Sequence, residues 1–328
     1  MVRYKELLIG GTNNMNEESY ILVYGDAFVD YIATDASNST FKKYMGGATI
    51  NVAAGISRIG APSSLITITG DDATSQFVRD ELKKEGVNTD FAIYDAAKRI
   101  SGVYVHLTET GEREFKNYID ETPALQVTPT QLQEAAFKKA SIVNVCSGTM
   151  FEPTALTTTQ AMIDMAKDKG VIIAIDANIR PLRWSNEDVC RDTIMQFFEE
   201  ADIVKVTDEE LAFLTQTTTI EDGIAALDAL LVPIVLVTVG ENGTYAVLNG
   251  ETMHVPTQKV KAVDTTGAGD AFMAGVLRDV HYNGLPTTPD ELMRCVSFGN
   301  KLGAMAATKA GALTALPCYD EVKQWIKE

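Results

Sequence analysis

Short apolar runs alternate with longer segments of helical periodicity along most of this chain. The apolar runs span residues 21–25, 64–69, 141–145, 171–175, 201–206 and 234–239. Between most of them, apolar residues recur at helical spacing over residues 48–59, 74–85, 153–169 and 186–200. Strands of a parallel sheet are buried on both faces and are joined by long crossover connections. The alternation therefore predicts an α/β fold with a doubly wound, mostly parallel central sheet that helices cover on both faces.

Two segments break this alternation. Residues 30–44 and 100–118 have the pattern of antiparallel strands, and residues 108–112 have the composition of a hairpin turn. We expect them to form a small β lid from about residues 30–45 and 98–120. The polar, Asn-rich residues 1–20 predict an N-terminal extension. Residues 21–328 contain no internal repeat or domain linker and predict one domain, with helices at 268–279, 289–308 and 319–327.

The charge balance bears on possible partners. Acidic residues outnumber basic ones by 45 to 28, which gives a net charge of −17. Such a chain repels phosphate backbones and anionic lipid headgroups, so we expect no nucleic-acid and no membrane partner. No apolar run approaches the roughly 20 residues of a membrane span, and residues 1–20 lack the apolar core of a signal peptide.

The cysteines and histidines bear on the cellular compartment and on metal binding. The four cysteines form no C-x-x-C motif, which favours free thiols over disulfides. The three histidines lie far apart in the sequence and give a zinc site or a histidine-based triad little support. These features predict a cytoplasmic protein.

The segment DTTGAGDAFMAG, residues 264–275, is the most informative for function. A strand-like run at 259–263 leads into a glycine-rich turn and then into a helix rich in small residues. Backbone N–H groups of such a turn, with the positive end of the helix dipole, form a site for an anion such as phosphate. Asp270 lies inside this site, where it is suited to take a proton from a hydroxyl group that attacks a phosphoryl group. The alternative is a structural turn, with Asp270 as an ordinary first-turn acid of the helix.

Other phosphate-binding motifs are absent from the sequence. The chain contains no Gly-Lys pair, which excludes the P-loop, and GAGDAF lacks the third glycine of a dinucleotide-binding fingerprint. The HRD and DFG motifs of eukaryotic protein kinases are absent as well.

Residues 264–275 resemble the carboxyl-terminal signature of the ribokinase-like (PfkB) carbohydrate kinases. Residues 46–53, GGATINVA, resemble the amino-terminal signature of the same family, and the two segments stand in the family's order and approximate spacing. The resemblance runs from about residue 21 to the carboxyl end. It implies a doubly wound α/β fold with a small β lid and ATP-dependent phosphorylation of a sugar hydroxyl. It also implies that Asp270 is the general base and that Gly267, Ala268 and Gly269 form the anion hole for the transferring phosphoryl group.

The resemblance also assigns substrate contacts. Asp30 matches the aspartate that holds sugar hydroxyls, with a turn residue before the lid as the alternative. Gly46, Gly47 and Asn51 match further contacts to the sugar. Residues 176–184, DANIRPLRW, resemble a D-x-N-x-R-x-x-x-W segment of fructokinases and 2-keto-3-deoxygluconate kinases that ribokinases lack. Arg180 in this segment can reach a polar ligand or form a structural salt bridge.

Further positions match the family's nucleotide and metal contacts. Residues 205–211 resemble its N-x-x-E element, with Thr207 in place of the Asn, and imply that Glu210 acts on Mg²⁺ through water. Three adjacent acids are also an ordinary helix start. The resemblance implies ATP contacts from Lys205, Thr238, Gly240, Gly243 and Asn300, although Asn300 could equally be a plain helical residue. Some family members also bind a monovalent cation such as K⁺, through positions that match Asp264, Thr266, Ala306, Lys309 and Gly311.

The sequence as a whole predicts an ATP- and Mg²⁺-dependent sugar kinase, with fructose as substrate and fructose 6-phosphate as product. The first alternative is 2-keto-3-deoxygluconate kinase, whose substrate carboxylate would need an extra cation such as Arg180, Arg99 or Lys116. A nucleoside or vitamin kinase of the same superfamily and a catalytically silent sugar sensor are further alternatives. A silent sensor has no reason to keep Asp270 together with both glycines of the turn, and this chain has all three.

The lid strand at residues 101–107 predicts how the lid packs. Val103, Val105 and Leu107 alternate with Tyr104 and His106. A small sheet cannot bury such an apolar face by itself, so this face must close over the sugar or pair with a second chain. Related sugar kinases commonly form dimers through crossed lids, and we therefore expect a homodimer through the β lid.

Overall fold

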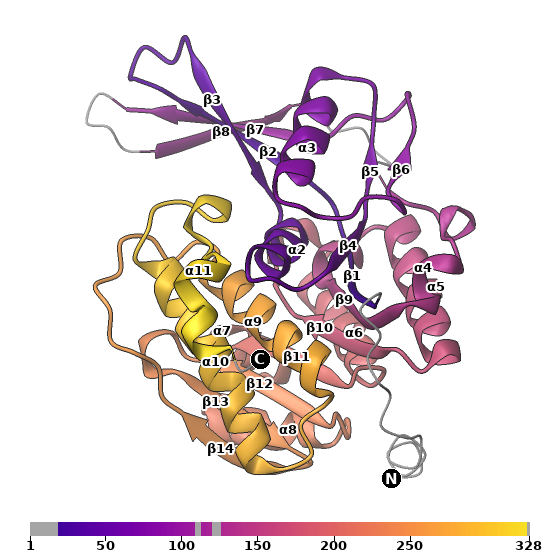
Figure 1. The fold of residues 1–328 in the computed structure, drawn as a ribbon, viewed down its shortest axis with the longest axis vertical. Coiled ribbons are helices and arrows are strands. Elements are labelled where there is room, and N and C mark those ends of the chain that lie inside the picture. Colours follow the sequence, from indigo (N-terminus) through magenta and orange to yellow (C-terminus); the bar gives the residue numbers. More distant parts are fainter. Residues whose placement is uncertain (1–18, 109–112, 120–125, 327–328) are drawn as a thin grey trace.

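A computed structural model describes residues 19–108, 113–119 and 126–326. Within these residues, an eight-stranded sheet has the order β14-β13-β12-β11-β10-β9-β1-β4 (Figure 1). Neighbouring strands from β4 to β12 run parallel, whereas β12, β13 and β14 pair antiparallel. The strands are β1 (Tyr20–Tyr24), β4 (Ser63–Ile66), β9 (Ala140–Cys146), β10 (Ile172–Asp176), β11 (Ile203–Thr207), β12 (Ile234–Thr238), β13 (Thr244–Leu248) and β14 (Glu251–Val255). This confirms the predicted mostly parallel sheet.

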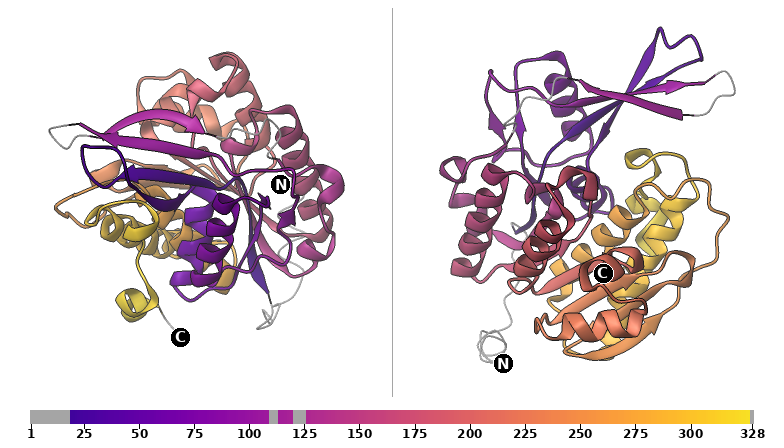
Figure 2. Two further views of the ribbon diagram at one scale, coloured as in Figure 1. Left: turned by 90° about the horizontal axis from the view of Figure 1, so that it is seen from above. Right: turned by 180° about the vertical axis from the view of Figure 1, so that it is seen from behind.

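Helices cover both faces of the sheet (Figures 1 and 2). One face carries α2 (Ala48–Arg58), α9 (Ala268–Asn283) and α10 (Pro289–Ala307), which pack on one another. The other carries α5 (Pro153–Lys169) and α7 (Asp208–Thr215), with α6 (Glu187–Phe198) and α8 (Ile220–Asp228) packed beside α7. The chain leaves β1 toward β4 and leaves β9 toward β10, in opposite directions along the sheet. Ligands of doubly wound folds bind at the carboxyl ends of the strands where the order reverses in this way.

A separate small sheet projects from this core at the top of Figure 1. Its order is β3-β2-β7-β8, with β2 (Phe28–Ala33), β3 (Phe41–Gly46), β7 (Gly102–Leu107) and β8 (Arg113–Ile119). β2–β3 and β7–β8 are antiparallel, whereas β2 and β7 are parallel. The expected hairpin turn falls largely on residues 109–112, which lie outside the described residues, as do residues 1–18 of the expected extension.

Further short elements complete the described chain. These are α3 (Ala73–Lys84), α4 (Ala135–Lys138) beside α5, the paired strands β5 (Ile68–Thr69) and β6 (Ile93–Tyr94), and α11 (Tyr319–Val322). Single 3-10 turns span Pro129–Gln131, Ser147–Thr149, Pro181–Arg183, Gly240–Asn242, Leu313–Ala315 and Lys323–Trp325. None of the helices that the structure describes is both long and apolar enough to cross a membrane.

Three segments differ from the sequence-based expectation. Residues 259–263 are irregular and exposed instead of forming a strand; the sheet edge is occupied by β14, and Val263 N donates to Ala307 O at 2.8 Å. The expected helix at 319–327 is reduced to α11 and one 3-10 turn. The hairpin β13–β14 was not predicted, although its Asn249-Gly250 turn, with φ of 48° and 87°, is a strong hairpin signal.

Candidate active site

Asp270 and Asn51 meet at the centre of the site. Asp270 lies in the first turn of α9, and its Oδ2 accepts a 2.8 Å hydrogen bond from Asn51 Nδ2 of α2. Both residues are buried, at 7% and 4% exposure. A carboxylate only accepts hydrogen bonds, so the Asn51 amide must turn its nitrogen toward Asp270. Asn51 Oδ1 is then left buried without a hydrogen-bond partner among the described residues.

The surroundings of Asp270 make it a weaker acid than usual. Burial raises its pKa to about 6, against the hydrogen bond from Asn51, which lowers it. The negative charge of Asp176 raises the pKa further, whereas Lys205 and Arg180 lower it. A carboxyl group with this pKa is ionised at neutral pH yet basic enough to accept a proton from a hydroxyl group.

The glycine-rich turn before α9 is held in a conformation that needs glycine. Gly267 has φ of 78°, and a Cβ on it would lie 2.9 Å from Ala312 Cα. Ala268 N donates to Thr265 O at 3.1 Å. By helix geometry, the next N–H groups, those of Gly269 and Asp270, have no acceptor inside the helix. The start of α9 is therefore suited to bind an anion, as the sequence predicts.

Lys205 lies beside this turn. It belongs to β11, is 3% exposed, and its Nζ donates to Asp176 Oδ1 of β10 at 3.0 Å. Burial opposes the charge of Lys205, but the carboxylates of Asp176 and Glu210 outweigh it and raise its pKa. The lysine therefore remains protonated, and the carboxylate of Asp176 compensates its charge.

Glu210 fixes the loop that contains Arg180. Its two carboxylate oxygens accept hydrogen bonds from Ile179 N and Thr207 N, both at 2.8 Å, and Thr207 Oγ1 accepts from Glu210 N in a capping box. Arg180 is exposed and donates a hydrogen bond to Ile179 O. Its positive charge lowers the pKa of Asp270. Glu210 thus has a clear structural role as a helix cap, and its contact with Mg²⁺ stays a prediction.

The expected sugar contacts lie at the junction of the small sheet and α2. A Cβ on Gly46 would lie 3.3 Å from Asp30 Oδ2, which places the end of β3 beside this carboxylate. Gly47, with φ of 114°, precedes α2, and a Cβ there would lie 2.6 Å from Asp26 O. Asp30 thus lies beside the glycines that lead into α2, the helix whose Asn51 bonds Asp270.

The expected nucleotide contacts lie farther along the sheet. Thr238 ends β12, pairs with Thr207 at the end of β11, and leads into the turn that contains Gly240. Gly243 follows the turn with φ of 91°, and a Cβ there would lie 2.3 Å from Val255 O. Asn300 is buried; it donates to Val255 O at 3.0 Å and accepts from Thr244 Oγ1 at 2.7 Å. Asn300 thus ties α10 to the hairpin, and its contact with adenine stays a prediction.

Asp264 joins the loops predicted to bind a monovalent cation. Its Oδ1 accepts from Thr266 N at 2.9 Å and from Thr266 Oγ1 at 2.6 Å, and its Oδ2 accepts from Gly311 N at 2.9 Å. Two segments that are distant in the sequence therefore meet at one carboxylate. Among the described residues, no group of three or more His, Cys, Asp or Glu side chains is arranged to hold a metal ion.

Asp26 and Arg183 lie near the expected site residues, although no sequence motif assigns them a role. The guanidinium of Arg183 lies 4.6 Å from the ring centroid of Phe151 and 6.0 Å from that of Phe28. Burial raises the pKa of Asp26 to about 7, against the charge of Arg183, which lowers it. Asp26 directly follows Gly25 at the end of the first apolar run, and this position at a strand's carboxyl end was the available signal.

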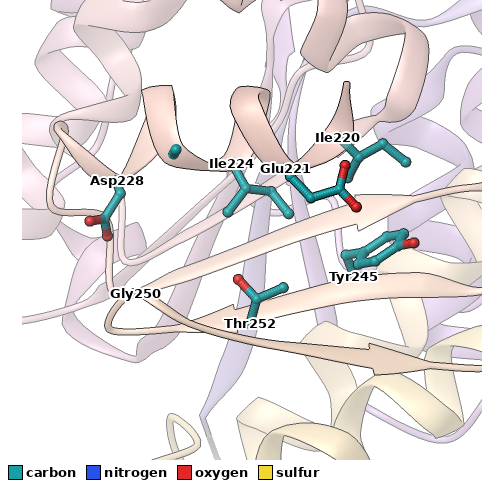
Figure 3. Close-up of a pocket in the computed structure, with 8 residues that line it drawn as sticks. Ile220, Glu221, Ile224, Asp228, Tyr245, Gly250 and Thr252 are labelled. Carbon is teal, nitrogen blue, oxygen red and sulfur yellow. The ribbon is translucent and has the colours of Figure 1, made fainter. Parts of the chain in front are cut away.

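Two cavities lie away from these residues. The first, of 290 Å³, lies between α8 and the hairpin β13–β14 and is lined by Ile220, Glu221, Ile224, Tyr245 and Thr252, among others (Figure 3). The second, of 690 Å³, lies between α9, α10 and the carboxyl end. Neither is lined by any of the predicted site residues.

Known proteins share both the sequence and the fold. Residues 18–318 match the model of the pfkB family carbohydrate kinase. A fructokinase from Klebsiella pneumoniae is 36% identical over 305 residues, which cover 93% of this chain and 98% of that protein.

Solved structures agree with these matches. The fructokinase of Vibrio cholerae O395, bound to fructose, ADP and calcium, superposes with a TM-score of 0.84 at 32% identity and covers 94% of this chain and 99% of its own. A double mutant of that enzyme with fructose, ADP and potassium gives 0.83 at the same identity and coverage. Aminoimidazole riboside kinase from Salmonella enterica, complexed with its riboside and an ATP analogue, gives 0.83 at 27% identity, covering 94% of this chain and all of that one (100%). The chain therefore belongs to the pfkB family of carbohydrate kinases.

Proposed function

We propose that this carbohydrate kinase phosphorylates fructose with ATP and releases fructose 6-phosphate. The observation that carries the proposal is the buried Asp270 at the start of α9, hydrogen-bonded to Asn51 and raised in pKa to about 6. The name of the Klebsiella relative and the fructose bound to the Vibrio enzyme support fructose as the sugar. The D-x-N-x-R segment at residues 176–180 supports it as well.

Asp270 acts as the general base in this proposal. It takes the proton of the attacking primary hydroxyl, and general-base catalysis is typically worth about 10²–10⁴ in rate. The turn Gly267–Gly269 and the start of α9 stabilise the negative charge of the phosphoryl group as it moves. Bound ATP with Mg²⁺ supplies the phosphoryl group and part of the charge neutralisation.

The start of α9 at Gly267, with the ammonium of Lys205 beside Gly269, suits the phosphates of ATP, which bind Mg²⁺. The described residues offer no cluster of three acidic or histidine side chains. Mg²⁺ in kinases is commonly held by substrate phosphates, waters and one or two carboxylates, so such a cluster is not required. We propose Glu210 as the nearby carboxylate that acts through water, and Lys205, Thr238, Gly240, Gly243 and Asn300 as the nucleotide contacts.

Asp30, Gly46, Gly47 and Asn51 are the proposed sugar contacts. A carboxylate such as Asp30 can accept hydrogen bonds from two hydroxyl groups. Asn51 Oδ1, which is buried without a donor in the described part of the chain, can accept one more. Arg180 is the proposed contact to a polar group at the outer end of the site. We propose one kinase domain over residues 21–328, in which the small sheet acts as a lid that excludes water.

The geometry around Asp264 favours a monovalent cation near the anion hole. Its carboxylate joins Thr266 and Gly311, which belong to the set of positions that matches the family's cation site. We propose that K⁺ binds here, and the potassium-bound Vibrio structure supports this choice of ion. The kcat in potassium chloride should exceed the kcat in choline chloride at equal ionic strength, and equal values would contradict the proposal.

The small sheet gives two different arguments about assembly. Val103 and Val105 are only 8% and 2% exposed within a single chain, so they do not need the cover of a partner. The opposite face carries four half-exposed aromatic residues, Tyr31, Phe41, Tyr104 and His106. Tyr31 stacks on Tyr104, and Phe41 contacts the rings of Tyr104 edge-on and of His106 at a tilt. We propose that the chain forms a homodimer through the small sheet and that this aromatic face is the contact.

All four cysteines are free in the described chain, three buried and Cys318 exposed. An exposed free thiol is typical of a reducing compartment, and we propose that the protein works in the cytoplasm.

Two alternative substrates follow from the same site. A carboxylate-bearing sugar such as 2-keto-3-deoxygluconate would need a cation, for which Arg180 is available; the side chain of Lys116 lies outside the described part. A nucleoside-like substrate is favoured by the similarity to aminoimidazole riboside kinase.

Release of ADP, measured with fructose, 2-keto-3-deoxygluconate, ribose, tagatose and nucleosides, separates these substrates. We expect the highest kcat/KM for fructose, and fructose-dependent release that is about 10²–10⁴-fold slower with Asp270→Asn. A higher kcat/KM for any other substrate would replace fructose in the proposal.

A further inference from the structure

The ion pair between Lys205 and Asp176 is the most deeply buried pair of charges among the described residues. Lys205 Nζ lies 3.0 Å from Asp176 Oδ1, and each side chain is only 4% exposed. The two residues are direct neighbours across β10 and β11, near the carboxyl end of both strands. Removing two charges from water often costs more free energy than their attraction returns. Stability of the fold is therefore a weak explanation for this pair.

The position of the ammonium group suggests a different purpose. A Cβ on Gly269 would lie 3.3 Å from Lys205 Nζ, so the ammonium is beside the glycine-rich turn at the start of α9. Within the described residues, its hydrogen bond goes to Asp176 alone. An ammonium group has three donors, and two of them are left for a ligand at this turn.

We propose that Asp176 is a positioning residue that holds the ammonium of Lys205 against the Gly267–Gly269 turn, where it meets the phosphoryl group being transferred. This inference rests on the proposed kinase reaction. A lysine side chain has four flexible carbons and does not fix the place of its charge by itself. Asp176 is well suited to fix it, because it ends a buried strand and the next residue, Ala177, donates its N–H to Lys205 O at 2.9 Å.

Asp176 also compensates the charge of Lys205 before ATP binds. The other titratable groups that face the pair are Glu210 from α7, Asp270 from α9 and the Cys146 thiol from β9, and Arg180 acts on Asp270 from its loop. Without the carboxylate of Asp176, burial favours the neutral form of Lys205 and lowers its pKa. The ion pair thus keeps Lys205 protonated at a buried position beside the anion site.

Asp176→Asn tests the proposal because it keeps the shape of the side chain and removes its charge. We expect the KM for ATP to rise and kcat to fall, each about 10–100-fold, because a phosphoryl-stabilising donor has lost its position. The Kd for fructose, measured without ATP, should stay within about threefold. The KM for ATP should also begin to rise at a lower pH in D176N than in the wild type, because loss of the Asp176 carboxylate lowers the pKa of Lys205.

A double variant shows whether Asp176 acts through Lys205. If it does, D176N added to Lys205→Met should change kcat/KM for ATP by less than about threefold, although D176N alone lowers it strongly. Asp202→Asn is the matched control, because Asp202 Oδ2 accepts from Ile173 N at the opposite end of the same strands. D202N should leave the KM for ATP unchanged. Circular dichroism and thermal unfolding establish that each variant is folded.

The outcomes separate this inference from the proposed function. A wild-type protein that shows no fructose-dependent ADP release contradicts the proposed function. An active wild type with an unchanged D176N variant, or a D176N effect of equal size in the K205M background, overturns the role of Asp176. A loss of fructose binding in D176N would also overturn it. If D176N does not fold, K205M is compared with the double variant, which lacks both charges of the pair. A lower kcat/KM for ATP in the double variant than in K205M would then overturn the role of Asp176.

Discussion

Asn51 Nδ2 donates a 2.8 Å hydrogen bond to Asp270 Oδ2 and joins α2 to α9 across 219 positions of the sequence. This bond connects the proposed base to the helix that follows the expected sugar contacts Gly46 and Gly47. It also stabilises the ionised form of Asp270 and so lowers its pKa against the effect of burial. One amide thus links the position of the sugar to the basicity of the group that must deprotonate it.

The pH dependence of the wild type follows from the pKa of Asp270. The base must be ionised, so kcat/KM for fructose should fall below about pH 6, with unit slope in the logarithm. A pH–rate profile between pH 4.5 and 8 measures this limb. An acid limb near pH 4, the ordinary value for a carboxyl group, would show that Asp270 is not raised or not the base.

Asn51→Ala should shift the acid limb of the pH–rate profile to higher pH. The hydrogen bond of Asn51 lowers the pKa of Asp270, so its loss raises the pKa and shifts the acid limb to higher pH. We also expect a higher KM for the sugar, because Asn51 Oδ1 is a proposed acceptor. The same profile measured on N51A checks both, and an unchanged limb would contradict the link between the two residues.

Asp30→Ala should act on the sugar and leave ATP binding unaffected. Each hydrogen bond to a charged group is worth roughly 1.5–3 kcal/mol, so the KM for fructose should rise about 10–100-fold or more. Steady-state kinetics with each substrate varied in turn gives the two KM values. A raised KM for ATP with an unchanged KM for fructose would mean that Asp30 has another role.

Light scattering tests the proposed dimer. The wild type should have the mass of a dimer at micromolar concentration, and Phe41→Glu should yield monomers by placing a charge in the aromatic face of the small sheet. Tyr94→Glu is the matched control, because Tyr94 is a 57% exposed aromatic residue on β6, outside that face. A monomeric wild type with full activity would refute the dimer.

His281 should make the folded state sensitive to acid. It is 3% exposed, and its Nδ1 lies 2.6 Å from Ser141 Oγ. Burial and then the charge of Arg278 lower its pKa from 6.5 to about 4. Between these two pKa values the unfolded chain binds the proton more tightly than the folded chain does. The contribution of the neutral, buried His281 to the free energy of unfolding is therefore complete above about pH 6.5 and is lost as the pH falls toward 4.

Urea unfolding at pH 7.5 and 5.5 measures that loss. The wild type should lose on the order of 1 kcal/mol more than His281→Gln between the two pH values. The comparison with H281Q removes the contributions of other titrating groups. Equal losses in both proteins would show that His281 is not held neutral.

The sequence predicts the features that depend on local pattern. The buried strands β1, β9, β10, β11 and β12 read as continuous apolar runs, and the glycine-rich turn with Asp270 is visible as a motif. Residues 259–263 have the composition of a strand, yet the sheet ends at β14 and these residues form an exposed irregular segment that leads to α9. Pairing partners are set by the whole sheet and cannot be read from one segment.

The contacts within the site are less predictable for the same reason. Asn51 and Asp270 could each be assigned a role, but their mutual hydrogen bond depends on how α2 packs on α9. The partner of Lys205 becomes visible only when β10 and β11 are placed side by side. Val103 and Val105 alternate with polar and aromatic residues, which predicts an apolar face on this strand. Only the folded small sheet shows that this face is already buried within one chain.

The direct test of the account is the turnover of Asp270→Asn, measured together with its affinity for fructose. The variant keeps the shape of the side chain and removes the proton acceptor. We predict that kcat falls about 10²–10⁴-fold, while the Kd for fructose, measured by calorimetry, changes only a few-fold. A variant that keeps more than about a tenth of the wild-type kcat would contradict the assignment of Asp270 as the general base.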